Sequence, residues 1–142
     1  SQVTGKLMVT VDVEYQGDLH CRAVHGPSRA ELTADAPTDN QGRGESFSPT
    51  DLVATALGTC MLTVMGILAR TLNLDIAGAT ATVEKEMTST APRRIQRLTV
   101  RIHVPGALSA ADRLTLERAA RTCPVHKSLH PDIHTPIEFT WG

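Results

Sequence analysis

The sequence contains few aromatic residues, which make up 3% of its 142 positions. A hydrophobic core must therefore be built mainly from aliphatic side chains. Neither sign of charge dominates, because 14 Lys and Arg residues stand against 15 Asp and Glu residues. Such a balance gives no sign of the basic surface that binds nucleic acids or anionic membranes, and we expect neither partner. The length corresponds to one domain, residues 1–142, with a single core.

Cysteine is also scarce, with three widely spaced residues at Cys21, Cys60 and Cys123. This is too few for the disulfide framework of a small secreted domain. No charged segment followed by a short apolar segment precedes the first expected strand, so no secretory signal is visible. We therefore expect a cytoplasmic protein, in whose reducing surroundings a cysteine is reactive or simply buried.

The longest uncharged run covers residues 52–69 and begins with a strong helix signal. Ser48 suits the N-cap, Pro49 suits the first helical position, and Asp51 can be the acidic partner of a capping box. The run is long enough to span a membrane. Its threonines, glycines and alanines, and the lack of flanking basic clusters, favour a buried helix instead. Since one small domain rarely covers a helix that is apolar on every face, the sequence predicts an obligate homodimer.

Alternating apolar and polar residues, interrupted by turn signals, predict the remaining elements. Strands are expected over residues 8–15, 19–25, 29–34, 77–87, 95–104 and 135–141, and further helices after Ser109 and at Cys123. On the helix after Ser109, the expected core residues are Leu114, Leu116 and Ala119. Runs of strands separated by helices predict an α+β fold with antiparallel sheets around the long central helix.

Cys60 lies in the middle of the uncharged run. A free cysteine in a buried helix often serves only as a small apolar residue, so a structural role is one interpretation. Thr59 and Thr63 could hydrogen-bond locally beside it. The position alone does not distinguish a structural thiol from a reactive one.

Cys123 lies at the expected N-cap of a short helix that begins with Pro124. Free backbone N–H groups and the helix dipole favour a thiolate there, and His126 and Lys127 add possible positive charge. The alternative is a cysteine that caps the helix without any reactivity. Both interpretations stay open at this point.

The histidines around Cys123 also allow a metal hypothesis. The spacing of Cys123, His126 and His130, with His134 beyond, superficially resembles that of zinc ligands. Pro131 interrupts the segment before His134, and the sequence has no Cys-x-x-Cys pair. We therefore expect no metal site, and we place His126 and His130 on a solvated helix face.

The other candidate side chains lie on expected strands without a visible partner. Cys21 carries no special spacing and is expected to be structural. The same holds for three histidines, expected to be surface or structural residues: His20, His25 and His103.

Two segments together carry a family resemblance. One is the helix start Ser48-Pro49-Thr50-Asp51-Leu52, followed by a cysteine at position 60, and the other is Thr122-Cys123-Pro124-Val125-His126. The order of elements adds to them: a strand meander, a long helix, a hairpin, a helix, the Cys-Pro-Val helix and a last strand. In these features nearly the whole chain resembles the family of osmotically inducible and organic-hydroperoxide-resistance proteins (OsmC/Ohr).

The resemblance implies an intertwined homodimer with long central helices, and a thiol peroxidase that acts on organic hydroperoxides. In that interpretation Cys60 is the peroxidatic cysteine and Cys123 is the resolving cysteine. Cys60 is oxidised to a sulfenic acid, Cys123 condenses with it to a disulfide, and an external dithiol reduces the disulfide. No metal or organic cofactor is implied.

The chain also departs from the family pattern. Peroxidatic members usually carry a glutamate directly after the helix-start proline, and this sequence has Thr50 there, with Asp51 next. Their arginine on the second strand falls on Leu19, while Arg22 matches a second basic position. Arg22 and Glu45 are alternative candidates for these supporting roles. Without a positive partner, desolvation raises the pKa of a buried thiol.

These departures leave two hypotheses. The first is a dithiol peroxidase that reduces organic hydroperoxides through Cys60 and Cys123. The second is a small-molecule-binding or redox-sensing protein of the same fold without peroxidase activity.

Overall fold

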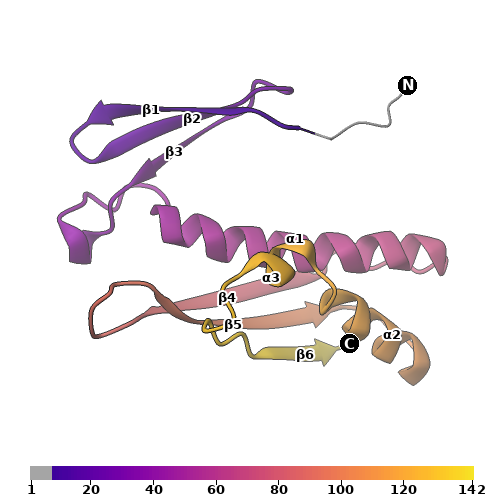
Figure 1. The fold of residues 1–142 in the computed structure, drawn as a ribbon. Helices are drawn as coiled ribbons and strands as arrows, with labels where there is room; N and C mark the ends of the chain where they lie inside the picture. Colours follow the sequence, from indigo (N-terminus) through magenta and orange to yellow (C-terminus); the bar gives the residue numbers. More distant parts are fainter. Residues whose placement is uncertain (1–7) are drawn as a thin grey trace. The chain divides into compact units, whose positions relative to one another are not determined.

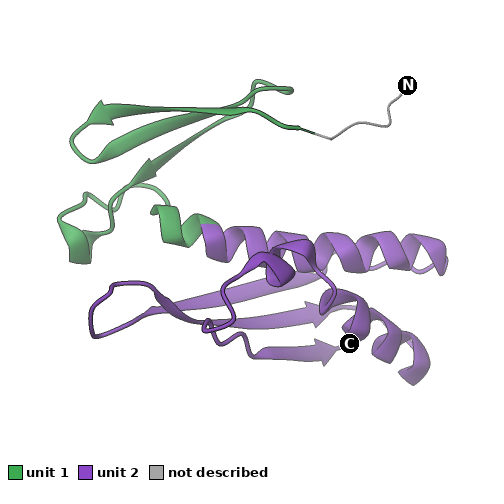
Figure 2. Cartoon of the chain, in the orientation of Figure 1, with its two compact units in different colours: residues 1–52 green, residues 53–142 purple. Residues whose placement is uncertain are grey.

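The computed structural model describes residues 8–142 and contains two compact units, residues 1–52 and residues 53–142 (Figures 1 and 2). We call them the N-terminal unit and the C-terminal unit. The expected start of the first strand at Met8 thus falls at the beginning of the described part. The elements are β1 (Val11–Gly17), β2 (His20–His25), β3 (Glu31–Asp35), the 3-10 turn η1 (Thr38–Asn40), α1 (Pro49–Thr71), β4 (Thr80–Met87), β5 (Ile95–Val104), α2 (Ala110–Ala120), α3 (Pro124–Ser128) and β6 (Ile137–Trp141).

The N-terminal unit contains a three-stranded antiparallel sheet in the order β1-β2-β3, as the sequence predicts. The turn between β1 and β2 is formed by Asp18 and Leu19, which both have positive φ angles. Two such residues are typical of the type I′ turn, whose twist matches that of the flanking strands. Leu19 is therefore a turn residue and not the first residue of the second strand.

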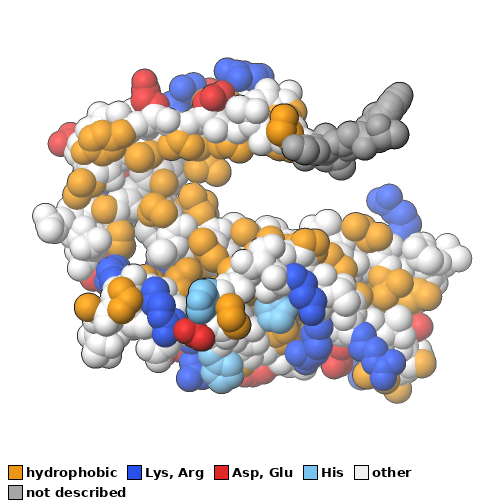
Figure 3. Space-filling model, in the orientation of Figure 1, with side chains coloured by type: hydrophobic (Ala, Val, Ile, Leu, Met, Phe, Trp, Pro, Cys, Tyr) orange, Lys and Arg blue, Asp and Glu red, His pale blue; other side chains and the backbone are white. Residues whose placement is uncertain are grey.

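One face of this sheet is apolar and exposed within the N-terminal unit. Val13 and Tyr15 are 66% and 64% exposed. Val13 lies opposite Ala23, which in turn lies opposite Leu32, so these side chains share one face. Figure 3 shows charged side chains gathered on one side of this unit and apolar side chains on the opposite side. The unit thus has an apolar sheet face that its own residues leave uncovered.

The start of α1 forms the predicted capping box. The Asp51 amide donates to the Ser48 hydroxyl over 3.1 Å, and the Ser48 amide donates to the Asp51 carboxylate over 2.9 Å. These bonds satisfy N–H groups that have no partner within the helix. The local sequence therefore fixes where α1 begins.

Within the chain, α1 is buried along one stripe and not on every face. The fully buried side chains of this stripe include Leu57, Met61 and Met65, whereas Ile67 is exposed. By length and composition alone, α1 is apolar enough to cross a membrane, a test that core helices also meet. Its buried stripe belongs to the hydrophobic core of the C-terminal unit.

The sheet of the C-terminal unit has the order β4-β5-β6 and is mixed. β4 and β5 pair antiparallel, but β6 pairs parallel to β5. The α+β class is thus confirmed, whereas the expectation of purely antiparallel sheets is wrong for this strand. The reason is the connection: α2 and α3 separate β5 from β6, and such a crossover allows a parallel return.

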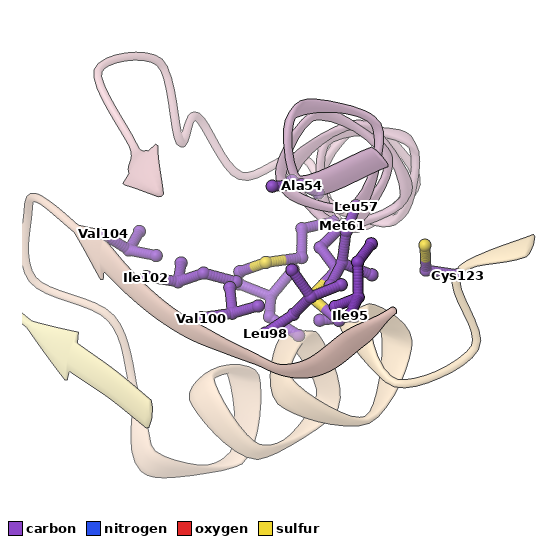
Figure 4. Packing of buried hydrophobic residues seen from close by; sticks show 13 residues of the cluster. Ala54, Leu57, Met61, Ile95, Leu98, Val100, Ile102, Val104 and Cys123 are labelled. Atoms are coloured by element: carbon purple, nitrogen blue, oxygen red, sulfur yellow. The ribbon is translucent and has the colours of Figure 1, made fainter. Parts of the chain in front are cut away.

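The core of the C-terminal unit lies between α1 and this sheet. Leu57 and Met61 of α1 point toward Leu98 and Val100 of β5 (Figure 4), and all four are fully buried. These aliphatic and thioether side chains form the core that the scarcity of aromatic residues predicts.

α2 contributes a narrower apolar face than expected. Leu116 and Ala120 are fully buried, and Ala119 is partly buried. Leu114 is 48% exposed, so its prediction as a core residue is wrong. One turn of helix separates positions that share a face, and Leu114 lies two residues from Leu116 on another side of α2.

Candidate functional site

Cys60 lies within α1, next to the buried stripe, and its side chain is partly buried. The hydroxyl groups of the two neighbouring threonines donate to the backbone of α1 and not to the Cys60 sulfur. The Thr59 hydroxyl donates to the carbonyl of Thr55 over 2.9 Å, and the Thr63 hydroxyl donates to the carbonyl of Thr59 over 2.7 Å. Both are bonds to the preceding helical turn, as is common for threonine in helices.

Cys123 is fully buried and is the N-cap of α3, as the sequence predicts. Its sulfur accepts a hydrogen bond from the amide of His126, with a nitrogen–sulfur distance of 3.4 Å. Pro124 occupies the first helical turn. An N–H group directed at the sulfur stabilises a thiolate more than a thiol.

The fold brings the two cysteines close together within the C-terminal unit, where Cys60 packs against the core cluster that contains Cys123 and its side chain interacts with the Cys123 thiol. Burial raises the pKa of the Cys123 thiol, and the contact with Cys60 raises it further. The backbone N–H groups of His126 and Val125 act in the opposite direction. The site thus holds two thiols within reach of each other, and two amide donors partly offset the cost of desolvating one of them.

The structure also shows a residue pair that the sequence did not reveal. The Nε2 atom of His126 lies 2.8 Å from the hydroxyl oxygen of Thr135, and the pair is partly buried. The expectation that His126 lies on a solvated helix face is therefore wrong. The partner precedes β6 by two residues, and no local pattern around His126 indicates that contact. His130, by contrast, is exposed as expected.

The supporting residues proposed from the sequence are engaged elsewhere. The Arg22 guanidinium forms a two-pronged ion pair with Glu31, with both nitrogen–oxygen distances at 2.8 Å. This pair raises the pKa of Arg22 and lowers that of Glu31. Glu45 is exposed and lies 3.6 Å from Arg43.

Thr50 and Asp51 belong to the first turn of α1. The Thr50 hydroxyl lies 3.3 Å from that of Ser48, and Asp51 is part of the capping box. Cys60 follows Asp51 by about two and a half helical turns along α1. Both residues thus have a visible role in starting the helix.

A buried carboxylate in the N-terminal unit gives His20 a partner that the sequence did not show. Asp35 is buried, and one of its oxygens is hydrogen-bonded to Nδ1 of His20. The other oxygen accepts the Glu45 amide over 3.1 Å, and the Asp35 amide donates to the Phe47 carbonyl over 3.0 Å. The bond to His20 lowers the pKa of Asp35, although burial opposes this, and Arg43 adds to the lowering. Asp35, at the end of β3, thereby binds the far end of the loop that leads to α1.

The remaining strand residues have ordinary partners. His25 bonds the Ser28 hydroxyl at 2.6 Å, and His103 bonds the Thr140 hydroxyl at 2.7 Å. Cys21 is a free, partly buried cysteine of β2. Over residues 8–142, no group of three His, Cys, Asp or Glu side chains is placed to hold a metal ion.

Comparisons with known proteins place this geometry in a family. A sequence model of the OsmC-like protein family matches residues 42–138. A structure from Psychrobacter arcticus 273-4, provisionally described as an osmotic stress induced and detoxification response protein, is 46% identical, with a TM-score of 0.89. The match covers 96% of this chain and 99% of that chain. A search of curated protein sequences gave no match.

More distant structures share the fold. An organic hydroperoxide resistance protein OsmC from Legionella pneumophila is 13% identical, with a TM-score of 0.76 over 96% of this chain and 99% of that chain. The organic hydroperoxide resistance protein OhrB of Bacillus subtilis is 14% identical, with a TM-score of 0.68 over 94% and 98%. The family match covers more than half of the sequence and includes both cysteines of the contact. The chain therefore belongs to the OsmC-like protein family.

Proposed function

We propose that this protein is a cysteine-based hydroperoxide reductase that removes organic hydroperoxides as part of a stress response. The observation that carries the proposal is the side-chain contact between Cys60 and Cys123. A disulfide requires the two sulfurs to approach closely, and the interaction between two thiols carried by different elements supports this step. Family membership and the names of the relatives support a redox role in detoxification.

The difference in exposure between the two thiols supports the roles that we propose for them. Cys60 is partly buried and Cys123 is fully buried, so a peroxide reaches Cys60 first. The Cys60 thiolate attacks one peroxide oxygen, the O–O bond breaks, and the released alkoxide takes up a proton to become an alcohol. Cys60 is then a sulfenic acid. The Cys123 thiolate attacks its sulfur, the S–S bond forms, and hydroxide leaves and is protonated to water.

The cycle closes when an external dithiol reduces the disulfide. It supplies two electrons and two protons and becomes a disulfide itself. The peroxide is thus the oxidant and the external dithiol the reductant. The proposed chemistry uses no metal or organic cofactor.

The deciding experiment follows consumption of tert-butyl hydroperoxide by the purified protein with a dithiol such as dithiothreitol. We expect turnover by the native protein and a loss of at least about 100-fold in Cys60→Ser, because the nucleophile is removed. Cys123→Ser should form the sulfenic acid but no intramolecular disulfide. Cys21→Ser is the matched control and should keep the native rate. An unchanged rate in Cys60→Ser would falsify the proposal.

A redox-sensing protein without turnover is a second candidate. The observation in its favour is that Arg22, a candidate cation for thiol activation, is held by Glu31. Such a protein would consume peroxide in the presence of dithiol no faster than free cysteine does at the same concentration. The same assay therefore separates the two functions, because only the reductase exceeds that rate.

We also propose that the protein works as a cytoplasmic homodimer. The apolar sheet face of the N-terminal unit, with Val13 and Tyr15, is exposed in the single chain. Large exposed apolar faces are typical of surfaces that a partner covers. A second copy of this chain would also cover the exposed apolar side chains of α1, such as Ile67.

A further inference from the structure

The hydrogen bond between His126 and Thr135 connects the residue next to the Cys123 sulfur with the segment that precedes β6. His126 supplies the amide that donates to the Cys123 sulfur, and its imidazole Nε2 lies 2.8 Å from the Thr135 hydroxyl. One residue thus contacts the sulfur with its backbone and Thr135 with its side chain. The other ring nitrogen, Nδ1, is buried and has no hydrogen-bond partner among the described residues. Thr135 is therefore the hydrogen-bond partner that orients the imidazole.

Thr135 is a rigid anchor because its neighbours on both sides are bonded to β5. The Leu98 amide donates to the His134 carbonyl over 2.8 Å, and the Val100 amide donates to the Pro136 carbonyl over 2.9 Å. Leu98 and Val100 are fully buried in the core. The position of the Thr135 hydroxyl is consequently set by the most buried strand of the sheet.

α3, in contrast, needs such an anchor. It spans five residues, and an isolated helix of this length is not stable in water. Its last backbone bond, from the Leu129 amide to the His126 carbonyl, is long at 3.4 Å. The direction of the His126 amide therefore depends on contacts outside the helix, and the bond to Thr135 is one such contact.

We propose that Thr135 and His126 are a positioning pair, in which the hydroxyl–imidazole bond holds the His126 amide on the Cys123 sulfur and thereby sets how fast Cys123 resolves the sulfenic acid on Cys60. Neither residue touches the peroxide in this role. The inference rests on the proposed reductase cycle for its kinetic consequence. Its structural part, a more readily ionised Cys123, does not require peroxide chemistry.

The chain contains a matched control for this pair. His103 and Thr140 form the same kind of bond, at 2.7 Å, between exposed side chains of β5 and β6. Thr140→Val removes a histidine–threonine bond of the same chemistry at an exposed position on the sheet. Thr135→Val removes the proposed anchor, and Thr135→Ser restores the hydroxyl.

The kinetic test mixes each reduced protein with tert-butyl hydroperoxide, quenches with acid, and quantifies sulfenic acid and disulfide by mass spectrometry after dimedone trapping. We expect Thr135→Val to form the sulfenic acid at the native rate. It should form the disulfide about threefold to tenfold more slowly at neutral pH, the usual range for one lost hydrogen bond. The difference should vanish at high pH, where Cys123 is ionised in every variant. Thr135→Ser and Thr140→Val should match the native protein.

A second test needs no peroxide. In a Cys21→Ser, Cys60→Ser background, Cys123 is the sole thiol, and its thiolate absorbance at 240 nm can be titrated. In the Thr135→Val variant, Cys123 should ionise at higher pH than in the parent protein. In the Thr140→Val variant, its ionisation should not change. If the native protein forms no disulfide with peroxide, the reductase proposal fails, and this titration still decides the role of the pair.

Two results would overturn the positioning role. One is a Cys123 titration curve that is the same in Thr135→Val as in its parent protein. The other is a slower disulfide step in Thr135→Val by the same factor at every pH, which indicates altered packing instead. If Thr135→Val does not fold, as judged by circular dichroism, His126→Phe removes the same bond and keeps the backbone amide. The same outcomes then apply to that variant.

Discussion

The side chains of Cys60 and Cys123 are in contact although α1 carries the first and the start of α3 carries the second. Only Cys60 retains access to solvent, since Cys123 is fully buried. This difference in exposure is the basis of the different roles that we propose for the two thiols, with Cys60 as the one that meets the oxidant.

Disulfide formation should accelerate as the pH rises. Burial and the contact with Cys60 raise the pKa of Cys123, so its thiolate is the minor form at neutral pH. The thiolate is the attacking species, and its fraction grows up to and beyond the ordinary ionisation range of cysteine. Quenched-flow measurement of disulfide formation between pH 6 and pH 10 tests this. A rate that does not change over this range contradicts the prediction.

Acid should destabilise the native protein partly through Asp35. The bond to His20 lowers its pKa in the folded state, so its stabilisation is present above the unfolded value and disappears as the pH falls through the folded one. Asp35→Asn should therefore remove part of the acid sensitivity of the urea midpoint between pH 7 and pH 3. Asp12→Asn, on exposed β1, is the control and should leave that sensitivity intact. An unchanged pH profile in Asp35→Asn counts against the assignment.

Removing the α1 cap should weaken the fold. Ser48 accepts the Asp51 amide and is buried, so Ser48→Ala leaves that amide without its acceptor. We expect a loss of about 1 to 2 kcal/mol in the free energy of unfolding, measured by urea denaturation. Ser89→Ala, in an exposed turn, should change it by less than about 0.5 kcal/mol. Equal effects at the two positions would show that the capping box contributes little.

Two leucines of α2 should respond differently to truncation. Leu116 is 0% exposed and Leu114 is 48% exposed. Leu116→Ala should lower the free energy of unfolding by about 2 to 5 kcal/mol, because it leaves a cavity in the core. Leu114→Ala should lower the free energy of unfolding by less than about 1 kcal/mol, because the side chain is half exposed in the single chain. Urea denaturation of both variants tests this, and a larger loss in Leu114→Ala than in Leu116→Ala contradicts the prediction.

The apolar sheet face should mediate dimerisation. Val13→Lys places a charge on the exposed face that we propose a second copy covers, and burying that charge without a partner is costly. The dimer should weaken by at least about tenfold in sedimentation equilibrium. Asp12→Lys, on the other face of β1, should leave dimerisation unchanged. A native protein that sediments as a monomer at micromolar concentration rules out the dimer.

Family membership and the α+β class are predictions from the sequence that hold. The helix start at Ser48 and the capping role of Cys123 are also confirmed, because both depend on residues within one turn of each other. The strand register needed more than local pattern. Leu19 lies in a type I′ turn and not in the second strand. A leucine gives no sequence signal for the positive φ angle that this turn requires.

The sequence by itself thus determined where the helices begin, which residues carry thiols, and the family to which the chain belongs. Tertiary structure alone decided that Cys60 and Cys123 lie close together, that Arg22 pairs with Glu31, and that Thr135 is hydrogen-bonded to His126. It also decided the parallel pairing of β6. The physical reason is the range of the interactions. Caps and turns involve neighbours in the sequence, whereas these contacts depend on how separate elements pack around one aliphatic core.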